Sequence, residues 1–109
     1  MKKFSSKEKG IIRDIKKCIL DINPTAEVYL YGSRARGDAI KESDWDILIL
    51  LNDINFSRSD ERLFRESVFD LELNYDEIIS IIAFSKNDWF TKHSVTPFYE
   101  NVMKEGVKL

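Results

Sequence analysis

The sequence has too few cysteines and too short apolar runs to support several common kinds of site. Cys18 is its one cysteine, which excludes a disulfide framework and a cysteine zinc site. We expect Cys18 to pack in the core among neighbouring isoleucines. No apolar run approaches the length of a membrane span, and the lysines near the N-terminus are not followed by the apolar stretch of a signal peptide. A cytoplasmic protein without a membrane interaction is expected.

The chain also lacks an excess of charge of either sign. Its 17 basic and 19 acidic residues leave a formal net charge of -2. Binding of nucleic acid without sequence preference needs a basic surface, so nucleic acid is not expected as the main substrate. The 109 residues, 43% of them hydrophobic, have an ordinary globular composition, and we expect one domain over residues 1–109. The sequence leaves the oligomeric state open.

Hydrophobic periodicity predicts the element order helix, strand, strand, helix, strand, helix, helix. A short helical turn with Ser33 as its N-cap is also expected after the first strand. This order predicts an α/β (α+β) fold in which helices pack on a small mixed sheet of three to four strands. The expected helices cover Ser5–Ile22, Ser57–Leu73, a short piece after Ser85 and a final piece after Thr96, and the expected strands cover Glu27–Tyr31, Trp45–Leu51 and Glu77–Phe84.

Two aspartates at the start of the second expected strand are the first candidates for chemistry. Asp44 and Asp46 are two residues apart, so on an extended chain both side chains point to the same side. Two neighbouring carboxylates repel one another when both are ionised, and a divalent cation between them removes that cost. Mg²⁺ prefers oxygen ligands and is often held by one or two carboxylates together with substrate phosphates. The pair therefore predicts a magnesium site.

The end of the first expected strand carries groups suited to phosphate. Gly32 lets the backbone approach a phosphate closely, and the Ser33 hydroxyl can donate to a phosphate oxygen. Arg34 and Arg36 add cationic donors nearby. Each feature alone is common in strand ends and turns, but together they predict a triphosphate bound between phosphate donors and metal-binding carboxylates.

The stretch YGSRARGDAIKESDWDILI from Tyr31 to Ile49 resembles the signature of the DNA polymerase beta-like nucleotidyltransferases, in which Gly-Ser, a spacer and Asp-x-Asp follow one another. With a spacer from Arg34 to Ser43 and a short chain, it looks most like the minimal nucleotidyltransferase (MNT) group. The resemblance implies the palm fold of that superfamily, triphosphate binding by Gly32 and Ser33, and Mg²⁺ binding by Asp44 and Asp46. Two ions are implied, with ATP as the nucleotide donor.

The resemblance also implies a third carboxylate at the next strand, which would serve as a catalytic and metal-binding residue. Asp76, which follows Tyr75, fits the family pattern best. Glu77 is adjacent, and two-residue alternation admits only one of the two on the catalytic side. We predict Asp76, with Glu77 as the alternative.

Single-domain members of this group commonly pair with a helical HEPN-domain protein, which implies that this chain is the antitoxin of an HEPN/MNT toxin–antitoxin pair and adenylylates its partner. Two alternatives remain: a catalytically weak nucleotide-binding module that neutralises a partner by binding, and a transferase that acts on a small molecule or an RNA end. The aromatic residues near the C-terminus fit either core packing or partner docking: Trp89, Phe90, Phe98 and Tyr99.

Overall fold

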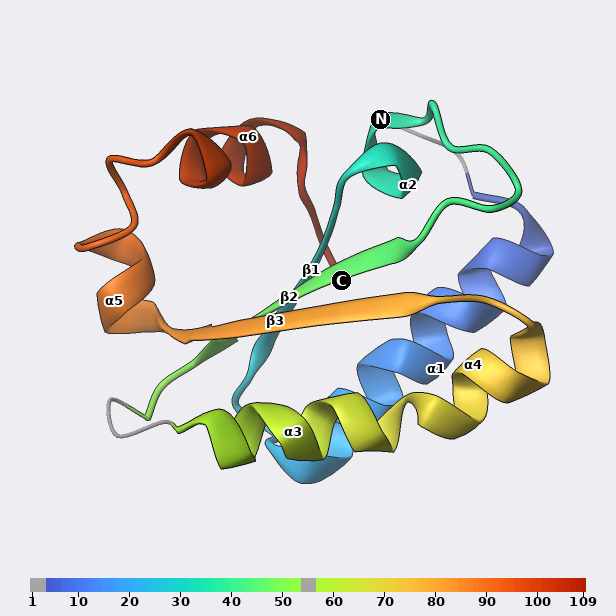
Figure 1. Ribbon diagram of the computed structural model, residues 1–109, viewed down its shortest axis with the longest axis horizontal. Coiled ribbons are helices and arrows are strands. Elements are labelled where there is room, and N and C mark those ends of the chain that lie inside the picture. The colour runs from blue at the N-terminus through green and yellow to red at the C-terminus, as the bar shows by residue number, and fades with distance from the viewer. Residues whose placement is uncertain (1–3, 54–56) are drawn as a thin grey trace.

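The computed structural model describes residues 4–53 and 57–109. A sheet with the strand order β3-β2-β1-β4 forms its centre, and helices lie on both faces (Figure 1). Strand β1 is antiparallel to both β2 and β4, while β2 is parallel to β3. The predicted mixed sheet with packed helices is thus confirmed. The strands are β1 (Glu27–Tyr31), β2 (Trp45–Leu51), β3 (Ile79–Ser85) and β4 (Val107–Lys108).

Helices α1 (Ser6–Ile22), α3 (Arg58–Ser67) and α4 (Phe69–Tyr75) cover one face of the sheet (Figure 1). Helix α1 begins at a capping box, in which the Ser5 hydroxyl accepts from the Glu8 N–H and the Glu8 carboxylate accepts from the Ser5 N–H. Its fully buried stripe packs on the inner side of β1 and β2: Ile11, Ile15 and Ile19. Cys18 is half-buried and packs against the same core, as expected.

The second expected helix is broken in two. The sequence predicts one helix over Ser57–Leu73, whereas the structure ends α3 at Ser67 and starts α4 at Phe69. The Ser67 hydroxyl donates to the Phe64 carbonyl at 2.7 Å. The Val68 N–H donates to the backbone carbonyl of Glu66, so the helical hydrogen-bond pattern stops here. Val68 is buried, and the break lets its side chain join the core.

Helices α5 (Lys86–Phe90) and α6 (Pro97–Glu105) cover the other face. Trp89 is fully buried there against Leu48 and Leu50 of β2, so it is a core residue rather than a docking residue. Phe98 and Tyr99 are half-buried, and Phe90 remains 47% exposed. Strand β4, which the sequence analysis did not predict, adds a fourth strand along β1.

The sheet register decides which side chains share a face. On the α5/α6 face, one row across the strands contains Tyr29, Leu48 and Ile82, which the helices cover. The remaining short helix, α2 (Ser33–Arg36), follows β1 directly. No helix in the described ranges is long and apolar enough to span a membrane.

Candidate active site

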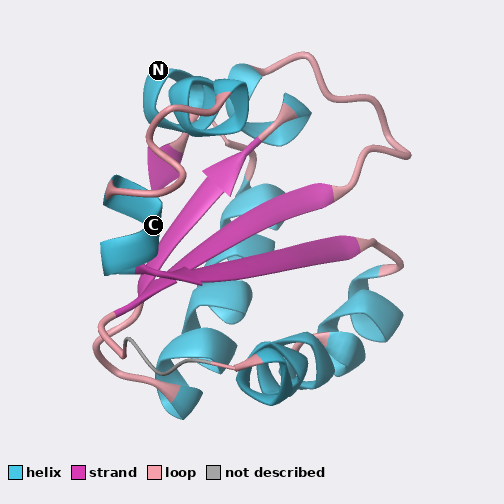
Figure 2. Cartoon of the chain, turned by 60° about the vertical axis from the view of Figure 1, so that its left-hand side comes forward, coloured by secondary structure: helices cyan, strands magenta, loops and turns pink. Residues whose placement is uncertain are grey.

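The candidate site lies where β1 ends and β2 and β3 begin, at the end where the strands splay apart (Figure 2). Antiparallel pairing sets Tyr31 opposite Asp46, and parallel pairing sets Ser80 beside Asp46. These three residues form the next row on the α5/α6 face. Asp44 lies immediately before the strand, two residues from Asp46, and so on the same side of the extended chain, as the sequence predicts. The register therefore brings the strand ends carrying Gly32-Ser33 and Asp44-x-Asp46 together.

At Gly32 the Gly-Ser part of the motif lies against the Asp-x-Asp part. Its backbone angles, φ 75° and ψ -158°, lie in a region open almost only to glycine. A Cβ at this position would lie 2.2 Å from Oδ2 of Asp46. The chain thus needs glycine here for two independent reasons. Gly32, rather than the expected Ser33, is the N-cap of α2, so the first turn of that helix starts directly beside the carboxylate.

Asp46 has an environment that favours a bound cation. Its side chain is half-buried, and burial raises the pKa of its carboxyl group, with the charge of Asp44 adding to the rise and Arg36 opposing it. A group whose ionised form is disfavoured by burial and by a like charge gains most when a cation neutralises both. The oxygen ligands and the shared face fit Mg²⁺.

Neither candidate for the third carboxylate joins the aspartate pair. Asp76 caps α4 in the left-handed conformation (φ 55°) and is exposed, while β3 begins only at Ile79, two residues later than expected. The Glu77 carboxylate turns toward Arg34 instead. Among residues 4–53 and 57–109, no three histidine, cysteine or acidic side chains are grouped closely enough to hold a metal.

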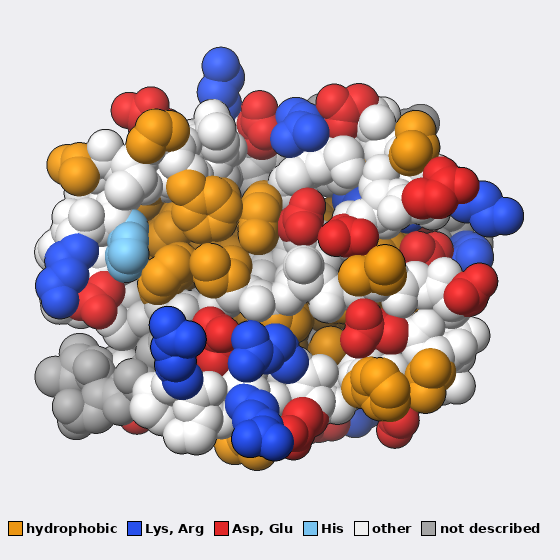
Figure 3. Space-filling model, in the orientation of Figure 1, with side chains coloured by type: hydrophobic (Ala, Val, Ile, Leu, Met, Phe, Trp, Pro, Cys, Tyr) orange, Lys and Arg blue, Asp and Glu red, His pale blue; other side chains and the backbone are white. Residues whose placement is uncertain are grey.

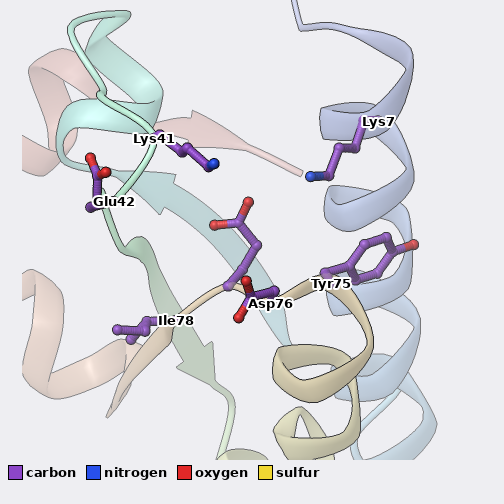
Figure 4. A pocket seen from close by; sticks show the side chains of 7 residues that line it. Lys7, Lys41, Glu42, Tyr75, Asp76 and Ile78 are labelled. Atoms are coloured by element: carbon purple, nitrogen blue, oxygen red, sulfur yellow. The ribbon is translucent and has the colours of Figure 1, made fainter.

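Asp76 lines a different cavity, which is the largest of the described pockets at about 510 Å³. It lies between the start of α1, the loop before β2 and the turn from α4 to β3, and Figure 4 shows Lys7 and Lys41 projecting into it from opposite sides. The left-handed cap of α4 turns the chain back before β3 starts. This turn places Asp76 at the cavity.

Arg34 also differs from its expected place beside phosphate. It is buried, with 8% of its surface exposed, and its Nη2 donates to the carbonyls of Lys41 (3.3 Å) and Ser43 (2.9 Å). The same nitrogen lies 3.4 Å from the Glu77 carboxylate. The guanidinium stacks over Trp45 with 4.8 Å between Cζ and the ring centroid. Arg34 therefore holds the loop that delivers Asp44, rather than facing a ligand.

Arg36 stays at the surface beside the site. It pairs with Asp38 through Nε (3.2 Å) and with Glu105 through Nη1 (3.3 Å), and both pairs are partly exposed. Its positive charge acts to lower the pKa of Asp46, and its side chain lines the pocket beside Gly32. Of the two predicted arginines, Arg36 alone can turn toward a phosphate without breaking a buried network.

A pocket of about 270 Å³ adjoins Gly32, and sequence reasoning missed most of its lining. Tyr31 and Phe98 form an edge-to-face pair with their centroids 5.3 Å apart. Burial, with the charge of Asp46, raises the pKa of Tyr31 to about 12, so its hydroxyl stays protonated. Asn101 and Glu105 of α6 add polar groups. The one signal in the sequence was the helical spacing that puts Phe98, Asn101 and Glu105 on one side of α6.

On the face drawn in Figure 3, acidic side chains lie at the centre beside a large apolar patch. The glycine turn and the paired carboxylates at neighbouring strand ends are the features on which the resemblance to the nucleotidyltransferases rests. The comparisons with known proteins agree. The family model described as a nucleotidyltransferase domain matches residues 12–109, so the chain belongs to this family and is a nucleotidyltransferase.

Two relatives from Methanocaldococcus jannaschii are each provisionally named a protein adenylyltransferase. One is 33% identical over 91% of this chain and 95% of its own length. The other is 37% identical over 73% of each chain. The resemblance to the minimal nucleotidyltransferases is thereby confirmed.

Solved structures of toxin–antitoxin complexes share the fold. One complex contains AMP-PNP, and its matching chain is 21% identical with a TM-score of 0.62, covering 88% of this chain and 69% of that one. A variant of the complex MntA–HpeT gives 19% identity, a TM-score of 0.61 and the same coverage. At sequence identities this low, the similarity to these structures establishes only a shared fold.

Proposed function

We propose that this protein transfers AMP from ATP to a hydroxyl group of a partner protein, with Mg²⁺ held by Asp44 and Asp46. The observation that carries the proposal is the contact between the Gly32 backbone and the Asp46 carboxylate, which joins the phosphate-binding turn to the metal-binding pair. The names of the archaeal relatives support a protein as the acceptor.

In the proposed reaction the acceptor oxygen attacks the α-phosphorus of ATP and forms a new P–O bond. The bond from the α-phosphorus to the bridging oxygen breaks, pyrophosphate leaves, and the hydroxyl proton of the acceptor passes to water. The bound cation would neutralise charge on the phosphates. The chain itself supplies a close backbone approach at Gly32, a hydroxyl at Ser33 and a cationic donor at Arg36, so its part is positioning and charge compensation.

We further propose that the acceptor is an HEPN-domain toxin and that this chain is its antitoxin. The support is the family resemblance together with the occurrence of this fold in toxin–antitoxin complexes.

The second candidate is an antitoxin that inhibits its partner by binding without transfer. The absence of a third metal-binding carboxylate near Asp44 and Asp46, within the ranges that the structure describes, favours this alternative. Transfer and simple binding both require a partner surface, and they differ only in the covalent product.

The test is incubation with the HEPN-domain protein encoded nearest to this chain, using ATP labelled at either the α- or the γ-phosphate. Nucleotidyl transfer labels the partner from α-labelled ATP only, and it is abolished in Asp44→Asn and Asp46→Asn. Glu42→Gln is the matched control, because Glu42 is an exposed acid in the loop before β2. Inhibition of the partner by the wild type without incorporated label would refute transfer and support binding alone. Label from the γ-phosphate would show phosphoryl transfer instead.

A further inference from the structure

The column of β3 side chains that flanks the aspartate pair carries no acid. Strand β3 is at the edge of the sheet, and alternation puts Ser80, Ile82 and Phe84 on the α5/α6 face. Ile78 precedes the strand with the same parity and is 59% exposed, and its carbonyl accepts from the Trp45 N–H at 2.8 Å. The strand next to the metal-binding pair therefore offers one hydroxyl among apolar side chains.

Ser80 is the residue from which a further ligand would have to come. It is the register partner of Asp46 and is exposed, so no packed side chain stands between it and the site. Neighbouring strands lie about 4.8 Å apart, and cations in two-metal sites lie roughly 3.5–4 Å apart. A carboxylate at this position could share a second cation with Asp46, whereas a neutral serine hydroxyl is a much weaker ligand for a hard divalent ion.

Three other acids near this end of the sheet lie away from the aspartate pair. Glu77 faces the buried Arg34 guanidinium, and Asp76 sits in the left-handed cap of α4, outside the strand. Glu105 on the opposite side pairs with Arg36.

Resting on the proposed function, we propose that the chain holds a single divalent cation with its nucleotide, and that Ser80 occupies the position from which a second cation would be bound. This differs from the two ions that the family resemblance implies. Ser80 thereby determines the number of metal ions at the site, and the chain offers no second cation to activate the acceptor hydroxyl.

The test counts Mn²⁺, which accepts the same oxygen ligands as Mg²⁺, in the complex with α,β-methylene ATP. Equilibrium dialysis against an equal concentration of the analogue gives the number of ions per chain, and electron paramagnetic resonance distinguishes an isolated Mn²⁺ from a spin-coupled pair. We expect one uncoupled ion in the wild type and a coupled pair in Ser80→Asp. Ser80→Asn, which matches aspartate in size without its charge, is expected to stay at one ion.

Each other result has a defined meaning. A coupled pair in the wild type would overturn the proposal, and its loss in Asp76→Asn would assign the third ligand to Asp76 as the sequence predicts. A single ion in both the wild type and Ser80→Asp would overturn the role of Ser80. Failure of the metal site itself is distinguishable, because the wild type would then bind no more Mn²⁺ than Asp46→Asn. Failure of AMP transfer is read separately, as the absence of α-label on the partner, and leaves the ion count unchanged. Circular dichroism of each variant establishes that it is folded.

Discussion

Replacing Gly32 by alanine is expected to damage the site more than it damages the fold. The added Cβ would lie 2.2 Å from Oδ2 of Asp46, and real Cβ atoms essentially never approach closer than 3.0 Å. The carboxylate or the turn must therefore shift by at least about 0.8 Å. Backbone angles open almost only to glycine add a conformational cost of roughly 1–3 kcal/mol. For a chain of this size that cost corresponds to a fall in Tm of roughly 4–15 °C.

The loss of ligand binding should be larger than this backbone cost alone produces. A displaced metal-binding carboxylate is expected to weaken Mn²⁺ affinity by roughly 10–100-fold, a range seen when the supports of metal ligands are removed. Equilibrium dialysis with α,β-methylene ATP measures that affinity, and urea denaturation measures the free energy of unfolding.

Gly37→Ala is the matched control for Gly32→Ala. Gly37 also has a positive φ of 94°, but it caps the other end of α2. It should lose about 1–2 kcal/mol of stability while keeping most of the Mn²⁺ affinity. Equal Mn²⁺ affinities in Gly32→Ala and the wild type would refute the reasoning that the close approach to Asp46 builds the site.

Three further predictions concern charge. Without metal, Asp46→Asn should have a higher Tm than the wild type at neutral pH, because burial and Asp44 raise the pKa of Asp46 and so disfavour its ionised form; Mg²⁺ titrations should reverse the order. Glu27→Gln should have a lower Tm at neutral pH, because the Glu27 carboxylate pairs with Lys86 and Lys108, which lower its pKa to about 2; the difference should vanish as pH falls from about 4.5 to about 2. Arg34→Met should destabilise the fold by roughly 2–4 kcal/mol in urea titrations, part of which Glu77→Gln should restore; an unchanged midpoint would contradict the buried network.

Much of the fold could be predicted because its local signals agree with its packing. The strand bounds Glu27–Tyr31 and Trp45–Leu51 are as predicted, and Thr96 followed by Pro97 marks the start of α6. The two-residue strand β4 carries too short a pattern to be recognised, since it forms by pairing with β1. The break at Val68 depends equally on packing, because the helical periodicity itself runs through it.

The candidate site divides in the same way. The sequence by itself determined that Asp44 and Asp46 share a side, because alternation along one strand is a local property of the extended backbone. It could not determine which residue of β3 stands beside Asp46. That depends on the register between two strands joined through α3 and α4, and so on how those helices pack. Tertiary structure therefore set Ser80 beside Asp46, left Asp76 in a helix cap and drew Arg34 into a buried network with Glu77.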